Sequence, residues 1–184
     1  MVINNMYDHL CSTTSDINEH LPTLKRYTEE VEHVTEMGVR WIVSTWAFLA
    51  GKPKKLISID IKHPKEFGAD LSVVEEAAKE SNIDFTFIEG STLEIQIEKT
   101  DLLFIDTLHT YTQLTKELEL HSKNVNQYIA LHDTKTFGYR DEQPQQSTKV
   151  GLKLAVSEFL EKNKDWKMFE EYTNNNGLTI LKRV

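Results

Sequence analysis

Short apolar runs alternate along the chain with stretches whose apolar residues recur at helical spacing. Runs that predict strands occupy residues 33–38, 55–60, 83–90, 102–106, 128–133, 167–172 and 178–183. The last two are separated by the turn sequence Asn-Asn-Asn-Gly and can pair as a hairpin. The alternation predicts the α/β class, with a single Rossmann-like, doubly wound sheet that is mostly parallel and carries an antiparallel hairpin at its C-terminal end.

The predicted helices begin at recognisable signals. Leu21 precedes a proline and opens the first of them. Ser44 or Thr45 is expected to cap a short second helix, and Asp70 is expected to cap the third. A last helix is predicted over residues 150–162, after a long loop rich in turn-forming residues.

Four polar residues fall at the ends of the fourth and fifth predicted strands. Asp106 and His109 follow the fourth strand, and His132 and Asp133 end the fifth. An amphipathic stretch lies between them, which makes a βαβ unit, and the carboxyl ends of parallel strands line the ligand crevice of such a sheet. Gathering two carboxylates and two imidazoles at one rim costs electrostatic and desolvation energy. Such clusters are typical of functional sites, so this rim is the candidate site. The alternative is a hydrogen-bonded network without a metal, in which His132 points back into the fold.

The end of the first predicted strand carries one glycine, Gly38, where the chain must turn into a helix. A dinucleotide-phosphate loop needs further glycines, but this chain has Arg40, Ile42 and Val43 there, which argues against a pyrophosphate site. Asp60 ends the second strand at a separation suited to hydrogen bonds with a ribose diol. An adenosine without a phosphate suggests S-adenosylmethionine (SAM), whereas a plain tight turn and a solvated carboxylate are the structural alternatives.

Composition is that of one soluble globular domain over residues 1–184, with residues 1–31 as an N-terminal arm and helix. The first twenty residues are polar and mixed, and predict either a loose arm or a cap on the substrate side. The net charge of −8 argues against a duplex nucleic-acid partner, because phosphate neutralisation needs a basic patch.

Cysteine content and hydropathy exclude several kinds of site and of protein. Cys11 is the only cysteine, which excludes an intramolecular disulfide and a multi-cysteine zinc site. No apolar run approaches the roughly 20 residues of a membrane span, and the first residues do not have the pattern of a signal peptide. We therefore expect a cytoplasmic protein without a membrane partner.

Five segments together resemble the successive motifs of class I SAM-dependent methyltransferases. They read, in order, EMGVRWIVST, LISIDI, IEGST, LLFIDTLHTY and YIALHDT. The resemblance covers residues 32–184 and is closest to the small methyltransferase-domain branch related to macrocin-type O-methyltransferases and cephalosporin-hydroxylase-like proteins. It implies the seven-stranded fold of the methyltransferases.

The resemblance also implies roles for individual residues. Asp106 and Asp133, with His132 beside them, are its candidate ligands for Mg²⁺ or Mn²⁺. His109 is placed to act as a general base or as another ligand, and Asp106 shares the catalytic role. The cofactor-binding positions that it implies are Glu36, Gly38, Ser44, Asp60, Glu89, Gly90, Ser91 and Asp106.

The expected function is SAM-dependent, divalent-metal-assisted O-methylation of a hydroxyl on a sugar or another small polar acceptor. Ile42 departs from the glycine of the family, and its branched side chain is expected where the family backbone approaches the cofactor. That departure favours an alternative, a catalytically weakened SAM-binding interaction module. A metal-dependent oxidoreductase or hydrolase that uses the same acidic rim is the other alternative. A small-molecule acceptor is the expected partner, and a homo-oligomer is compatible with the sequence.

Overall fold

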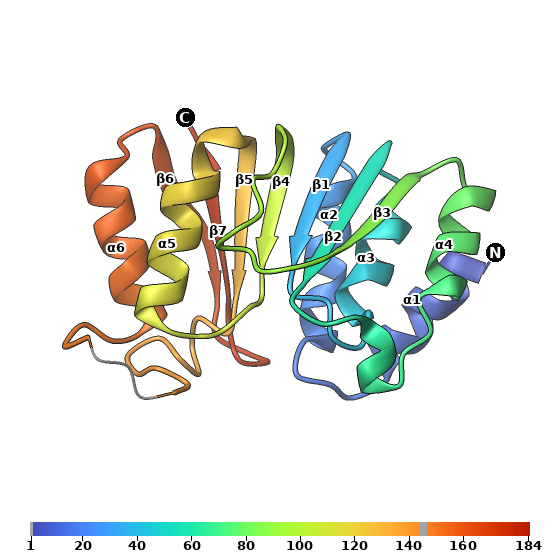
Figure 1. The fold of residues 1–184 in the computed structure, drawn as a ribbon, viewed down its shortest axis with the longest axis horizontal. Coiled ribbons are helices and arrows are strands. Elements are labelled where there is room, and N and C mark those ends of the chain that lie inside the picture. Colours follow the sequence, from blue (N-terminus) through green and yellow to red (C-terminus); the bar gives the residue numbers. More distant parts are fainter. Residues whose placement is uncertain (1, 144–146) are drawn as a thin grey trace.

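The computed structural model describes residues 2–143 and 147–184. In this part of the chain one seven-stranded sheet has the order β3-β2-β1-β4-β5-β7-β6 (Figure 1). Neighbours among β1 to β5 are parallel, and β7 runs antiparallel to both β5 and β6, so the predicted sheet and its C-terminal hairpin are confirmed. The strands are β1 His33–Met37, β2 Lys55–Asp60, β3 Asp84–Glu89, β4 Thr100–Ile105, β5 Val125–His132, β6 Trp166–Tyr172 and β7 Leu178–Arg183.

Helices cover both faces of the sheet and enclose two apolar cores. β4 shows why both faces are buried: Leu102 and Phe104 belong to the core under α1 to α4, whereas Leu103 and Ile105 belong to the core under α5 and α6. No helix in the described ranges is long and apolar enough to cross a membrane. The helices are α1 Val2–Ser12, η1 Asn18–His20, α2 Leu21–Thr28, α3 Val43–Gly51, η2 Pro64–Phe67, α4 Ser72–Glu80, α5 Tyr111–His121, η3 Ser122–Asn124 and α6 Leu152–Lys162.

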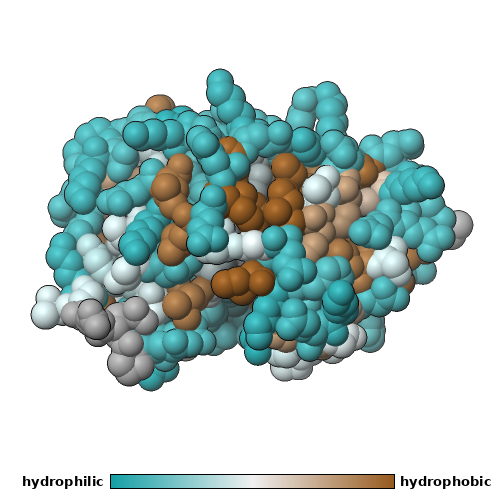
Figure 2. Space-filling view, viewed as in Figure 1, coloured by the Kyte–Doolittle hydropathy of each residue, from teal (hydrophilic) through white to brown (hydrophobic). Residues whose placement is uncertain are grey.

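The connection from β3 to β4 crosses the sheet without forming a helix (Figure 1). Ile95 and Ile97 of this connection pack into the core under α5 and α6, and so take the place of a covering helix. Figure 2 shows apolar side chains gathered in the middle of this face, within a largely hydrophilic surround. The same connection brings Ser91 and Thr92 to the carboxyl ends of the strands, where the candidate site lies.

The N-terminal segment is folded onto the domain, which excludes the loose arm. Helix α1 packs on α3, and Ile3 is buried there. The chain after α1 is tied to the β6–β7 turn, where the Asn175 side chain accepts from the Glu19 N–H and donates to the Ser15 carbonyl, at 3.0 and 2.9 Å. Ile17 in this segment is buried, so the segment is a fixed part of the wall next to the candidate site.

Helix α3 begins differently from the sequence prediction. Its N-cap is Ile42, in a left-handed conformation with φ 58°, and neither Ser44 nor Thr45 caps it. Both hydroxyls instead donate to Glu36 on β1, because a buried carboxylate offers a stronger acceptor than solvent does here. The N-cap of α4 is Leu71 rather than the predicted Asp70. Asp70 lies one residue earlier, and its carboxylate accepts from the Ser72 N–H at 3.0 Å.

Candidate functional site

The carboxyl ends of β1, β2, β4 and β5 open onto one cavity of about 620 Å³. Gly38, Asp60, Asp106 and Asp133, which follow or end these four strands, all line it. Since parallel strands end at the same edge of the sheet, residues far apart in the sequence meet there. The expected gathering of these four positions is therefore present.

Gly38 forms the tight turn between β1 and the loop that leads to α3. Its φ is +88°, and an added Cβ would lie 1.9 Å from the carbonyl oxygen of Asp106. Two hydrogen bonds fix the approach: the Gly38 N–H donates to Ile59 at 2.9 Å, and the Asp106 N–H donates to Met37 at 2.8 Å. Only glycine fits here, because both the conformation and the contact between backbones exclude a side chain.

Asp60 holds this loop in place. Its Oδ2 accepts from the N–H groups of Val39 and Arg40 at 2.7 and 3.0 Å, and its Oδ1 accepts from the Lys62 N–H at 3.0 Å. A carboxylate has about four acceptor positions, so these bonds leave about one unused, and Asp60 lines the cavity. Asp60 thus has a structural role in addition to the ligand-binding role that the sequence predicts.

Replacing Asp60 with alanine should weaken binding of S-adenosylhomocysteine (SAH) at least tenfold and lower the free energy of unfolding by about 1–3 kcal/mol. The reason is that three loop N–H groups lose their acceptor at the cavity wall. Calorimetry gives the affinity and thermal melting gives the stability. Asp70→Ala is the matched control, because that carboxylate also accepts from backbone, but at the start of α4. Equal SAH affinities in both variants would show that Asp60 has no part in ligand binding.

Glu36 lies beneath the cavity rather than in its wall. It is fully buried, and burial raises its pKa to about 7, although the hydroxyl donors around it lower the pKa. Those donors are Ser44, Thr45 and Ser58. The expected contact between Glu36 and a bound cofactor is therefore not available in this conformation, whereas Ser44 does line the cavity. Glu36 ties β1 and β2 to the first turn of α3.

Ile42 does not obstruct the cavity. Its side chain is buried in the core under α1 to α4, and the cavity is lined instead by the residues on either side of it. The left-handed φ of 58° directs the side chain this way at a conformational cost of about 1–2 kcal/mol. The steric objection that the sequence raised against cofactor binding is removed.

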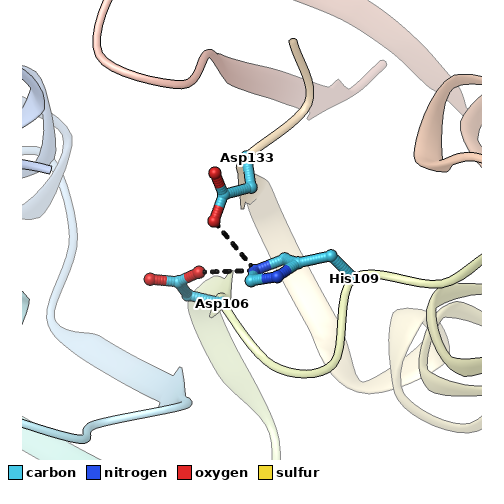
Figure 3. A group of neighbouring side chains, drawn as sticks. All are labelled: Asp106, His109 and Asp133. Atoms are coloured by element: carbon cyan, nitrogen blue, oxygen red, sulfur yellow. Dashed lines mark hydrogen bonds and ion pairs between the residues drawn. The ribbon is translucent and has the colours of Figure 1, made fainter. Parts of the chain in front are cut away.

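Asp106, His109 and Asp133 converge on one point of the cavity wall (Figure 3). The Nε2 of His109 lies 3.0 Å from Asp106 Oδ1 and 3.0 Å from Asp133 Oδ2. Burial lowers the pKa of His109, but the two carboxylates outweigh it and raise the pKa to about 10. The histidine pairs correspondingly hold the pKa of both carboxyl groups below the usual range, against the effect of burial.

His132 is buried behind this cluster and does not line the cavity. Its Nδ1 lies 3.3 Å from Asp106 Oδ1, and its Nε2 lies 3.3 Å from the carbonyl oxygen of Asn175. Asp133, the next residue, has a φ of 60°, so the alternation of the strand stops there. Its Oδ2 lies 3.5 Å from the Nδ1 of His132. The three donor atoms that come together are those of Asp106, His109 and Asp133, with His132 as a support.

Of the three cofactor-binding positions predicted after β3, only one lines the cavity. Ser91 lines the cavity, whereas Glu89 is exposed and neither it nor Gly90 does. Although Trp41, Ile61 and Thr92 lie within the quoted motif segments, several lining residues were not predicted individually. These are Asp16, Ile17, Trp41, Ile61, Phe67, Thr92, Gln113 and Glu142.

A buried carboxylate, Glu117 of α5, supports the wall formed by the β3–β4 connection. It accepts from the hydroxyls of Thr92 and Thr107 and from the Gln113 amide at 2.5–2.9 Å. Thr92, Thr107 and Gln113 line the cavity, so Glu117 fixes their side chains from behind. Tyr111, the first residue of α5, does not line the cavity. Its side chain is buried in the core, and its hydroxyl donates to Glu158 at 2.8 Å.

Comparison with known proteins identifies the fold. No family model matches the sequence, and no curated protein matches it. The chain is similar to an O-methyltransferase from Bacillus cereus crystallised with SAH, with 14% identity and a TM-score of 0.60 over 100% of this chain and 97% of that chain. It is similar to the O-methyltransferase TomG from Streptomyces achromogenes, crystallised with SAM, with 14% identity and a TM-score of 0.60 over 94% and 82%.

A third similar structure is a Staphylococcus aureus protein assigned as a caffeoyl-CoA O-methyltransferase. Its identity to this chain is 16%, and its TM-score is 0.64 over 90% of this chain and 83% of that chain. The chain therefore has the fold of the class I SAM-dependent methyltransferases, and at the level of the fold the resemblance noted in the sequence is confirmed.

Proposed function

We propose that the protein is a SAM-dependent O-methyltransferase that uses a divalent cation and methylates a hydroxyl of a sugar or another small polar acceptor. One observation carries the proposal: Gly38, Asp60, Asp106 and Asp133 line a single cavity of about 620 Å³. The fold supports it, because similar structures named as O-methyltransferases were crystallised with SAM or SAH.

The β1–β2 side of the cavity suits an adenosyl group. Gly38 leaves the backbone bare, and Asp60 presents a carboxylate to a ribose diol. Apolar side chains at the same edge, Trp41, Ile61 and Phe67, are 36–70% exposed and offer faces for an uncharged base. Apolar walls with few convergent polar groups are typical of small-molecule sites.

The β4–β5 side suits a cation and the acceptor. The donor atoms of Asp106, His109 and Asp133 lie within 4.8 Å of one another, and Asp133 Oδ1 is buried without a hydrogen-bond partner in the described structure. These groups fit a divalent cation, which lowers the pKa of a bound hydroxyl. The protein then has to align that oxygen with the methyl group and accept its proton, and it needs no activation of the sulfonium.

The burial of Ile42 in the core argues against the alternative of a weakened binding module. The proposal is tested by calorimetric titration with SAH, with and without Mg²⁺ or Mn²⁺, followed by a methyl-transfer screen over hydroxyl acceptors. We expect saturable binding of one SAH per chain and transfer that EDTA abolishes. Absence of SAH binding would contradict the proposal and favour a metal-dependent hydrolase or oxidoreductase. SAH binding without transfer to any acceptor would favour the binding module.

A further inference from the structure

We propose that His109 is the third protein ligand of the cation, through Nε2, that Glu142 orients it, and that the site consequently prefers Mn²⁺ or Fe²⁺ over Mg²⁺. The inference rests on the proposed function only in assuming that Asp106 and Asp133 hold a cation. It assigns His109 to the metal rather than to the role of general base, so the proton of a hydroxyl whose pKa the cation lowers would leave to solvent water. It also gives a role to Glu142, which the sequence did not single out.

Two distances match the spacing of adjacent ligands around one cation. In octahedral coordination with bonds of about 2.1 Å, neighbouring ligand atoms lie about 3.0 Å apart. His109 Nε2 lies 3.0 Å from Asp106 Oδ1 and 3.0 Å from Asp133 Oδ2. The three atoms thus surround a point that one cation can occupy in place of a proton on Nε2 (Figure 3). A cation held by these three side chains would have further ligand positions for the acceptor and water.

Glu142 fixes which nitrogen of His109 faces the carboxylates. Glu142 Oε2 lies 3.0 Å from His109 Nδ1 and 3.3 Å from the His109 backbone nitrogen, whose N–H donates to it. The Glu142 N–H donates in turn to the His109 carbonyl at 2.9 Å. A carboxylate on Nδ1–H leaves the lone pair of Nε2 for a metal, which is the usual arrangement of a metal-binding histidine.

The ring plane of His109 is also held. Phe137 stacks on it with the ring centroids 4.9 Å apart and the planes 3° from parallel. The stack and the Glu142 contact together restrain the imidazole, which is 16% exposed. Asp133 faces the same point through Oδ2, and its carboxylate is nearly buried, with 9% of the side chain exposed. A histidine this constrained is poorly suited to swing toward an acceptor as a base.

The donor set selects the class of cation. Two carboxylate oxygens alone suit Mg²⁺, which prefers oxygen ligands and keeps its waters. An imidazole nitrogen in the same shell suits Fe²⁺ and related transition metals, while carboxylates also suit Mn²⁺. Mn²⁺ is the probe of choice because it is paramagnetic and accepts both kinds of ligand.

The test is a titration of the unloaded protein with Mn²⁺, followed by electron paramagnetic resonance. Electron spin-echo modulation should show a coordinated imidazole nitrogen in the wild-type protein, and His109→Gln should remove it. Glu142→Gln should weaken Mn²⁺ binding about 10–100-fold, the usual cost of losing an outer partner. Glu170→Gln is the control, since Glu170 pairs with Arg26 away from the cavity. Mg²⁺ should displace Mn²⁺ only in at least tenfold excess.

Several results would overturn the inference: no Mn²⁺ binding, binding without the nitrogen signal, or a signal that survives in His109→Gln. Unchanged Mn²⁺ affinity in Glu142→Gln would remove the orienting role. Failure of the proposed function shows separately, as absence of SAH binding in calorimetry. Circular dichroism confirms that each variant is folded before its Mn²⁺ affinity is compared.

Discussion

Asp106→Asn should lower the rate of methyl transfer by at least about 10³-fold, which corresponds to about 4 kcal/mol of transition-state stabilisation. Asparagine keeps the shape of the side chain but removes the charge that faces both His109 and His132. The proposed cation loses one of its two carboxylates, and the acceptor hydroxyl keeps its proton. The measurement is the initial rate with the acceptor found in the screen, together with Mn²⁺ affinity in its absence.

Stability has to be followed alongside the rate. Burial lowers the pKa of His132, but Asp106 and Asp133 outweigh it and raise the pKa to about 10. His132 loses one of these two carboxylates in the variant, so the free energy of unfolding should fall by about 2–4 kcal/mol. Assays should therefore be run well below the melting temperature of the variant. Asp101→Asn is the control, because Asp101 lies on the same strand but at its other end, where it accepts from the Glu32 and His33 N–H groups. A fully active Asp106→Asn would end the proposed role of this carboxylate.

The strands, the mostly parallel sheet and the place of the site could be predicted because they follow from short-range patterns. LLFID and YIALHD are apolar on both faces, which is the pattern of central parallel strands, and β4 and β5 are indeed central. The acidic residue that ends each run then has to lie at the carboxyl edge. The run at residues 83–90 alternates more than the others, which is typical of a strand near an edge, and β3 is an edge strand.

The predicted roles of single residues were wrong where a side chain could reach either the cavity or a polar group in the interior. Glu36 is at the end of β1, next to the cavity in sequence terms, but its hydroxyl partners on α3 and β2 draw it into the interior. His132 and Asp133 are consecutive, and alternation alone cannot show that both belong to one cluster, in which His132 contacts Asp106 and Asp133 contacts His109. The contact of Glu142 with His109 depends on a loop path that no local pattern specifies.

Adding one methyl group at Gly38, in the Gly38→Ala variant, should strongly reduce both stability and SAH binding. We expect the free energy of unfolding to fall by about 3 kcal/mol or more and SAH binding to weaken at least tenfold. The added Cβ would meet the backbone of Asp106, with the carbonyl oxygen at 1.9 Å and the carbonyl carbon at 2.6 Å. Backbone cannot rotate away as a side chain can, so the ends of β1 and β4 must separate.

Gly68→Ala distinguishes this clash from the general cost of a positive φ. Gly68 has a φ of +79°, close to that of Gly38, but no atom lies within 4 Å of the position that a Cβ would take there. The free energy of unfolding of Gly68→Ala should therefore fall only by the conformational cost of a positive φ, about 1–2 kcal/mol. Its SAH affinity should be unchanged. The difference between the two melting curves measures how closely β4 approaches the turn after β1. Similar losses in both variants would mean that the two strand ends can move apart freely, and a site built from both would not be held in a fixed geometry.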